Sequence, residues 1–247
     1  MRFAIFLPMQ EKTARIIAKL QTFFKEAGFQ KAVVGLSGGV DSALTAKLGV
    51  MALGKEKVTG ILMPHEGMSS PSSLKDAEDL AKELGISYHI VPINPFIGQY
   101  KNLPWKSSPL ADVNIQARAR AVILYHFANT HNALVLGTGN KTEETLGYFT
   151  KYGDGACDVL PIGNLYKTQV WEMGAELGLP EVILKKAPSA ELMEGQTDEG
   201  EIGLSYSQMD EILRKFETGG KPESEQEKAL MKRIVENAHK GKVPPVL

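Results

Sequence analysis

The feature that most constrains the fold of this chain is the alternation of strand-like and helix-like segments up to about residue 140. The strand-like segments are short apolar runs at residues 32–36, 58–63, 86–92 and 133–137. After a first helical stripe that ends at Gly28, the helix-like segments lie at residues 41–52, 72–84 and 111–130. This alternation predicts an α/β fold, a doubly wound parallel sheet with helices on both faces.

No strand pattern continues beyond that point, so we expect a helical C-terminal part. Its helices are predicted at residues 168–177, 180–185, 208–217 and 223–239. A chain of 247 residues with a hydrophobic content of 43% can bury a full core, and we expect a single domain over residues 1–247. Two connections have little regular pattern, and residues 64–73 and 187–207 are therefore candidate lids over a ligand site.

Composition excludes several classes of protein. The net charge of −1 lacks the basic excess that a general nucleic-acid grip requires. The single cysteine, Cys157, rules out an internal disulfide and a clustered thiolate metal site. The first apolar run is too short for a signal peptide, and no stretch approaches the length that crosses a membrane. We therefore expect a cytoplasmic protein without a nucleic-acid or membrane partner.

The strand-like run at residues 32–36 is followed by the polar, glycine-containing turn Ser37-Gly38-Gly39-Val40-Asp41-Ser42. Paired glycines let the backbone approach a ligand and direct N–H groups at it, and the following helix N-terminus favours anions. An aspartate fits such a site when a cation bridges it to phosphate, and Mg²⁺ is the natural bridge. The turn matches neither a Walker loop nor the dinucleotide fingerprint. It is therefore a candidate site for a nucleotide and a metal ion, although a simple capped turn has a similar pattern.

Two further polar stretches follow the strand-like run at 133–137. The first, residues 137–144, contains Thr138 at the sheet edge where Ser37 is also expected, and Glu143 or Glu144 could complete a metal shell with Asp41. The second, residues 147–158, mixes aromatic, glycine and charged residues in a way that suits neither helix nor strand. We interpret this second stretch as the wall of a pocket.

The turn at residues 37–42 resembles the pyrophosphate-binding loop of the N-type ATP pyrophosphatases. Residues 137–167, read as GTGNKTEETLGYFTKYGDGACDVLPIGNLYK, together with 114–120, 188–192 and 196–199, are similar to the motifs of the NAD synthetases in the same order. The resemblance covers nearly the whole chain. It implies a Rossmann-like fold of the adenine nucleotide alpha hydrolase type and a homodimer.

The resemblance also implies a reaction, the last step of NAD biosynthesis. In it the nicotinate carboxylate of deamido-NAD attacks the α-phosphorus of ATP, pyrophosphate leaves, and ammonia displaces AMP from the adenylated acyl group. Such a transfer needs mainly positioning and charge neutralisation by the protein. The substrates would be ATP, deamido-NAD and ammonia, with Mg²⁺ as cofactor. Free ammonia is expected because the turn begins at residue 37, which leaves no room before it for an amidase domain.

Residue roles follow from the same resemblance. It implies catalytic roles for Asp41, Asp154 and Lys167, with Asp154 receiving ammonium. It selects Asp41 and Glu143 as the magnesium ligands. The residues implied to bind ATP are Gly35, Leu36, Ser37, Gly38, Gly39, Val40, Asp41, Ser42, Thr138, Lys167 and Ser189. Those implied to bind deamido-NAD are Arg118, Lys151, Asp158, His239 and Lys240.

Helical geometry adds one expectation to these roles. Asn114 and Arg118 share a helix face, whereas Arg120 points to the opposite side, so Arg120 is predicted to serve another surface if Arg118 meets the ligand.

Three alternatives use similar loops. A GMP-synthetase-like amidating enzyme is disfavoured by the stretch at 147–158, and a tRNA thiolase by the near-neutral charge and lone cysteine. A regulator that senses ATP without turnover would have no use for Asp154 as an ammonium site. Product analysis separates all three.

Overall fold

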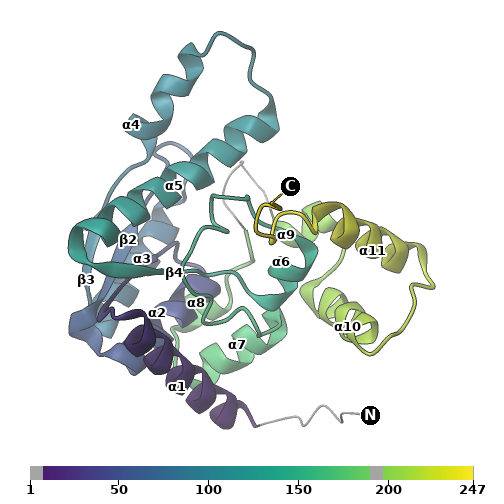
Figure 1. The fold of residues 1–247 in the computed structure, drawn as a ribbon, viewed down its shortest axis with the longest axis horizontal. Coiled ribbons are helices and arrows are strands. Elements are labelled where there is room, and N and C mark those ends of the chain that lie inside the picture. Colours follow the sequence, from purple (N-terminus) through teal and green to yellow (C-terminus); the bar gives the residue numbers. More distant parts are fainter. Residues whose placement is uncertain (1–7, 190–196, 247) are drawn as a thin grey trace.

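The computed structural model describes residues 8–189 and 197–246, with helices on both faces of a four-stranded parallel sheet (Figure 1). The strand order is β3 (Ser87–Ile90), β2 (Val58–Leu62), β1 (Lys31–Gly35) and β4 (Ala133–Leu136). In register, Val33 of β1 lies opposite Thr59 of β2 and Val135 of β4. The chain moves outward from β1 to β3 and then returns to the other side of β1. This reversal opens a crevice between the carboxyl ends of β1 and β4, where ligands bind in open parallel sheets.

The alternation along β1 divides the core between the two faces of the sheet. Ala32 and Val34 pack into a cluster with α1 (Met9–Ala27), α2 (Val40–Leu53) and α3 (Pro71–Leu84). Val33 points the other way and packs with Ile123 of α5 (Pro109–His131). Successive side chains on a strand face opposite sides, so one continuous apolar run supports helices on both faces. The predicted doubly wound parallel sheet is confirmed.

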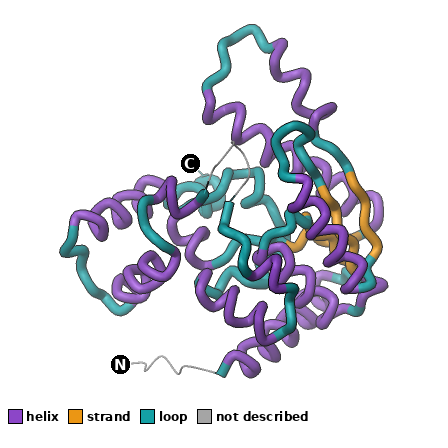
Figure 2. The backbone as a smooth tube through the Cα atoms, turned by 180° about the vertical axis from the view of Figure 1, so that it is seen from behind, coloured by secondary structure: helices purple, strands orange, loops and turns teal. Residues whose placement is uncertain are grey.

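Short helical pieces occupy connections in which no element was predicted. They are η1 (Lys55–Lys57), α4 (Asn94–Ile97) and η2 (Gly98–Asn102). Together with the start of α5, α4 and η2 stand away from the rest of the molecule (Figures 1 and 2). Trp105, in the connection before α5, is 64% exposed.

The C-terminal part is helical, as expected, over the residues that the structure describes. Its elements are α6 (Lys141–Leu146), α7 (Lys167–Glu176), α8 (Glu181–Leu184), α9 (Asp198–Ile202), α10 (Tyr206–Glu217) and α11 (Glu225–Asn237). Helix α9 corrects the prediction of an irregular segment at 187–207. The Thr197 side chain caps this helix by accepting the Gly200 N–H at 3.2 Å, and five residues are too few to show a helical period. Residues 190–196 of the same candidate lid lie outside the described residues. No helix among the described residues is long and apolar enough to span a membrane.

A buried aspartate fixes the start of α7. Asp210 of α10 is fully buried and accepts hydrogen bonds from the Thr142 hydroxyl and from the Thr168 N–H, the latter at 2.9 Å. Thr142 in turn accepts the Lys167 N–H at 3.0 Å. The first N–H groups of a helix have no partner within the helix, and the negative carboxylate also suits the positive end of the helix dipole. The first turn of α7 is therefore held by α6 and α10.

Replacing Asp210 with alanine should destabilise the protein by about 2–4 kcal/mol, because the Thr168 N–H and the Thr142 hydroxyl would lose a buried, charged acceptor. Urea unfolding followed by circular dichroism measures this free energy. Asp210→Asn keeps one carbonyl oxygen and should lose less. Equal stability of the alanine variant and the wild type would contradict this role.

Candidate active site

A cavity of about 670 Å³ opens at the crevice between β1 and β4. This volume lies within the usual range for small-molecule sites. Its lining includes the turn after β1, the turn after β4, the stretch at 147–156 and residues 186–189. Each of these regions overlaps a stretch singled out from the sequence, and the fold brings all four together around one cavity.

The turn after β1 is held by its own serines. Ser42 Oγ accepts the Ser37 N–H at 3.2 Å and donates to the Gly39 carbonyl at 3.0 Å, and the two serine hydroxyls lie 3.1 Å apart. Gly38 has a φ of +80°, and a Cβ on it would lie 2.3 Å from the Ser73 carbonyl oxygen. Only glycine fits this conformation and this close approach. The turn is thus pressed directly against the first turn of α3.

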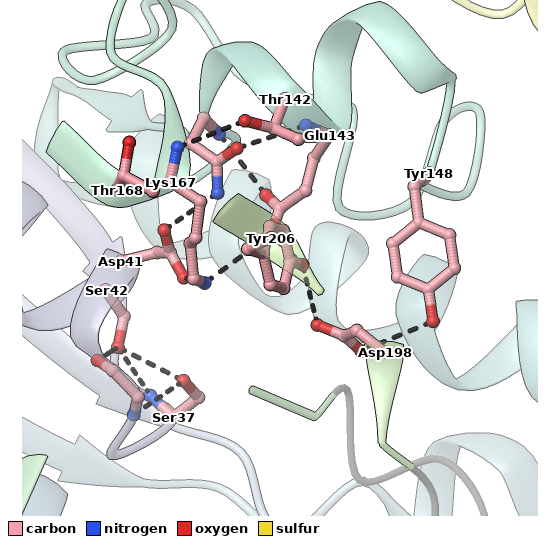
Figure 3. A network of polar contacts seen from close by, with 12 residues as sticks. Ser37, Asp41, Ser42, Thr142, Glu143, Tyr148, Lys167, Thr168, Asp198 and Tyr206 are labelled. Carbon is pink, nitrogen blue, oxygen red and sulfur yellow. Dashed lines mark hydrogen bonds and ion pairs between the residues drawn. The ribbon is translucent and has the colours of Figure 1, made fainter. Parts of the chain in front are cut away.

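Lys167 of α7 joins the carboxylates of the two turns (Figure 3). Its ammonium forms a close ion pair with Asp41, and its Nζ lies 3.7 Å from Glu143 Oε1. The Lys167 side chain is only 3% exposed. A buried charge of this kind is stable only when paired and hydrogen-bonded. The arrangement therefore needs all three groups.

Asn140 connects the two carboxylates and was missed by the sequence analysis. Its side-chain oxygen accepts the Glu143 N–H at 3.0 Å while its amide nitrogen donates to Asp41 Oδ1 at 2.9 Å. Glu143 returns a hydrogen bond to the Asn140 N–H at 3.3 Å, which completes a capping box at the start of α6. The spacing of Asn140 and Glu143 is the sequence signal that could have identified it.

Electrostatics in this group favour a cation. Burial and the neighbouring Asp41 together raise the pKa of Glu143 to about 8, against the opposing attraction of Lys167. Burial by itself would lower the pKa of Lys167, but the attraction of Asp41 and Glu143 outweighs burial and the pKa is raised. One ammonium therefore faces two carboxyl groups, and Glu143 retains its proton up to about pH 8, which a cation bound to both groups would displace.

Replacing Glu143 with glutamine should stabilise the protein more as the pH rises. The folded wild type holds a proton on Glu143 between pH 4.5 and about 8, whereas the unfolded chain releases it near pH 4.5. Wild-type stability should thus fall across this window, by at most about 1.4 kcal/mol per pH unit, and Glu143→Gln has no such proton to lose. Thermal melts at pH 5, 6.5 and 8 measure the difference. A stability difference that is constant across these pH values would refute the assignment.

Aromatic rings and a buried aspartate complete the surroundings of Lys167. Its Nζ lies 5.0 Å from the ring centroid of Tyr206 and 5.7 Å from that of Trp171. The Tyr206 hydroxyl donates to Asp198 at 2.9 Å, and Asp198 also accepts from Tyr148 at 3.3 Å (Figure 3). Tyr206 had no local sequence signal, because it joins the site only through the packing of α10.

Asp154 lies in the cavity wall formed by the stretch at 147–156. Its Oδ1 accepts the Thr150 N–H at 2.9 Å, and the Thr150 hydroxyl lies 2.8 Å from Asn114 Oδ1. The side chain is accessible from the cavity, but protein surrounds it on the other sides. This burial raises the pKa of Asp154, against the opposing hydrogen bonds from Thr150. A carboxylate with a raised pKa is a better proton acceptor.

Four of the residues expected to bind deamido-NAD lie close together. Arg118 Nε donates to the Lys151 carbonyl at 3.3 Å, and Lys151 Nζ donates to the His239 carbonyl at 2.9 Å. Lys240 Nζ donates to the Gly147 carbonyl at 2.7 Å. Lys240 lines the cavity, whereas the other three do not contribute to its described lining. These three residues contact one another in a chain that ends next to Lys240.

Asp158 lies apart from the other four. Its carboxylate accepts the Val135 N–H of β4 at 2.7 Å and the Tyr125 hydroxyl at 3.2 Å. In this structure it therefore ties the edge strand β4 to α5.

The helical-face argument predicted that Arg120 would serve another surface if Arg118 met the ligand. In the structure it is Arg120, and not Arg118, that belongs to the described cavity lining. Arg120 lines the cavity and donates from Nε to the Met63 carbonyl at 3.1 Å, at the carboxyl end of β2. Arg118 is exposed. The two do point to different sides, as predicted, but the relation of each side to the cavity depends on how α5 lies across the sheet.

The family model described as NAD synthase matches residues 12–244. The chain belongs to the NAD synthase family. The NH(3)-dependent NAD(+) synthetase of Archaeoglobus fulgidus is 44% identical over 232 residues, which cover 94% of each chain. Among solved structures, an NMN synthetase from Francisella tularensis matches with a TM-score of 0.87 and 33% identity, covering 98% of this chain and 99% of that chain. The NH3-dependent NAD synthetase of Campylobacter jejuni, in complex with the nitrate ion, has a TM-score of 0.84 and 34% identity, with the same coverage.

These matches confirm the family and the fold that the sequence motifs indicated. The Rossmann-like fold is shared with the solved NMN synthetase and NAD synthetase over almost the full length of the chain.

Two carboxyl groups beside the turn at residues 37–42 are the candidate ligands for a magnesium ion. In residues 8–189 and 197–246 no group of three or more His, Cys, Asp or Glu side chains could hold a metal ion. Asp41 and Glu143 nevertheless supply two hard oxygen ligands beside the pyrophosphate-type turn. Mg²⁺ usually takes one or two carboxylates together with substrate phosphates, so this donor set fits Mg²⁺ in the presence of a nucleotide.

Proposed function

We propose that this protein amidates deamido-NAD with ammonia to give NAD, while ATP is cleaved to AMP and pyrophosphate. The observation that carries the proposal is the convergence of Lys167, Asp41 and Glu143 on the turn at residues 37–42, within a chain of the NAD synthase family. In the first step a carboxylate oxygen of the nicotinate forms a bond to the α-phosphorus, and the bond to pyrophosphate breaks. In the second step ammonia forms a bond to the acyl carbon, and the bond to AMP breaks.

We assign roles to the residues of the cavity on this basis. Ser37, Ser42 and the glycines between them bind the departing diphosphate through hydroxyl and N–H groups. Lys167 neutralises charge and keeps Asp41 in place. Asp41 and Glu143 would hold Mg²⁺, which supplies charge neutralisation of the triphosphate when bound. Thr138 and Ser189, which line the cavity, contact ATP.

Asp154 acts in the second half of the reaction. Ammonium binds beside its carboxylate and gives up a proton to it, so that neutral ammonia can attack the acyl carbon. The raised pKa of Asp154, caused by burial, favours this transfer.

A homodimer is part of the proposal. Arg118, Lys151 and His239 form a surface beside the cavity rather than part of its described lining. We infer that a second subunit covers this surface, so that the dinucleotide is held between two chains. Light scattering after gel filtration measures the mass.

We also expect the cytoplasm as the compartment of the reaction.

A second candidate substrate is nicotinic acid mononucleotide. It is favoured by the likeness to the NMN synthetase from Francisella tularensis. The chemistry of the acyl group is the same in both substrates, and they differ by one adenylyl group.

Product analysis tests the proposal. The protein is incubated with ATP, Mg²⁺ and ammonium, and with either deamido-NAD or the mononucleotide, and products are separated by chromatography. Formation of NAD and AMP only with deamido-NAD supports the proposal, and faster amidation of the mononucleotide would overturn the substrate assignment. Excess EDTA should abolish pyrophosphate release, and glutamine in place of ammonium should not support turnover.

A further inference from the structure

Cationic side chains reach the cavity at five described positions, namely Arg120, Lys167, Lys186, Arg233 and Lys240. Three of them have contacts away from the turn at residues 37–42. Arg120 donates to Met63, Lys240 to Gly147, and the Arg233 guanidinium lies 5.2 Å from the ring centroid of Tyr148. Lys167 is already engaged by Asp41 and Glu143. Lys186 is the fifth of these described side chains, and none of the roles assigned above includes it.

Lys186 follows α8 and reaches across to α3. Its Nζ lies 2.5 Å from Asp76 Oδ2 and 3.2 Å from Ser73 Oγ. The Lys186 side chain is 24% exposed and that of Asp76 is 13% exposed. The ion pair is thus partly desolvated, but it borders the open cavity and can exchange partners without unfolding a core element.

Ser73 connects Lys186 to the turn at residues 37–42. The Lys186 ammonium contacts the hydroxyl of Ser73, and the carbonyl of the same residue lies against Gly38, with 2.3 Å to the position that a Cβ would take. Ser73 and Ser37 both line the cavity. Ser73 therefore contacts both the Lys186 ammonium and the turn that binds the departing diphosphate.

The charge of this turn is unsuited to a polyanion without further help. Residues 37–42 contribute hydroxyls, N–H groups and the negative Asp41, but no cationic side chain. A departing diphosphate carries several negative charges, and stabilising charge that develops in the transition state is the main task of such a site. A lysine is well suited to this task as a mobile point charge.

We propose that Lys186 is a diphosphate-binding residue that leaves Asp76 and contacts the terminal phosphates of ATP and the departing pyrophosphate. The proposal rests on the proposed function, and it names a residue for which no role follows from the motifs. Before the nucleotide binds, the ion pair with Asp76 keeps the Lys186 ammonium at the edge of the cavity.

A structural role would make a different prediction from a binding role. If Lys186 only joins the segment after α8 to α3, then Lys186→Met and Asp76→Asn break the same ion pair and should have the same effect. If Lys186 binds diphosphate, loss of the lysine should be far more harmful than loss of its partner. Asp76→Asn leaves the ammonium in place and removes a competing anion.

Titration calorimetry with pyrophosphate and Mg²⁺ provides the test without turnover. Lys186→Met should raise the dissociation constant of pyrophosphate by about 10- to 100-fold, as expected for the loss of a charged hydrogen bond. Asp76→Asn should bind as tightly as the wild type or more tightly, and Lys186→Arg should recover part of the affinity. Lys185→Met is the matched control, because Lys185 is exposed and pairs with Glu181 at 2.7 Å. It should leave pyrophosphate binding unchanged.

Kinetics provide a second readout. Lys186→Met should raise the KM for ATP and slow pyrophosphate release, while the KM for the acyl substrate stays within about threefold. Equal loss of affinity in Lys186→Met and Asp76→Asn, or unchanged affinity in Lys186→Met, would overturn the inference and leave the proposed function standing. Failure of the wild type to bind pyrophosphate with Mg²⁺ would also overturn the inference, whereas the product analysis decides the proposed function separately.

Discussion

Lys167→Met should lose at least about 100-fold in the rate of pyrophosphate release, since a preorganised charge in a water-poor site contributes on this scale. It should also destabilise the protein by about 3–5 kcal/mol, because the Asp41 carboxylate would remain largely buried without its cation and next to Glu143. Single-turnover quench experiments measure the rate, and urea unfolding measures the stability.

Two controls separate chemistry from stability. Lys75→Met removes an exposed lysine that pairs with Asp79 along one helix, and it should leave the stability nearly unchanged because solvent screens the pair. The double variant Lys167→Met/Glu143→Gln removes the ionisable carboxyl group beside Asp41, so it should recover part of the stability as the pH rises but none of the activity. Recovery of activity in the double variant would show that Lys167 acts only by supporting the fold.

Asp154→Asn should separate the two halves of the reaction. Asparagine can still accept the hydrogen bond from Thr150 N–H, which Asp154 accepts at 2.9 Å, so the wall of the cavity should keep its shape. It cannot take a proton from ammonium. We expect the amidation step to slow by about 100- to 1,000-fold and the adenylation step by less than tenfold.

The acyl adenylate should therefore accumulate in a single turnover of Asp154→Asn, and chromatography of quenched samples detects it. Raising the pH supplies more free ammonia and should recover part of the lost rate. If both half-reactions slow equally, or if high pH brings no recovery, Asp154 has a different role.

The turns at the ends of β1 and β4 show how far sequence reasoning reaches. The period of two in Ala32, Val33 and Val34 and the helical segments between strands are local properties, because they follow from the sterics of neighbouring residues. They predicted the parallel sheet, and with it the meeting of Ser37 and Thr138 at one edge. The family motifs then indicated Asp41, Glu143 and Lys167, and these three form one group in the structure.

The arrangement around that group required the tertiary structure. Asn140, Tyr206 and Asp198 join the site through contacts with Asp41, Glu143 and Tyr148, which lie far from them in the chain. Lys186 likewise meets Asp76 across 110 residues. Arg120 shows the same limit within one helix, since its direction relative to Arg118 was predictable but the position of the cavity was not.

For this protein the sequence by itself determined the fold class, the sheet edge that carries the site and the residue types at the two turns. Those features depend on short-range periodicity and on residue chemistry. The tertiary structure alone decided which charges pair, because Coulomb and hydrogen-bond energies depend on distances and burial that packing sets. The motifs indicated Lys167, but only packing places its ammonium between Asp41 and Glu143.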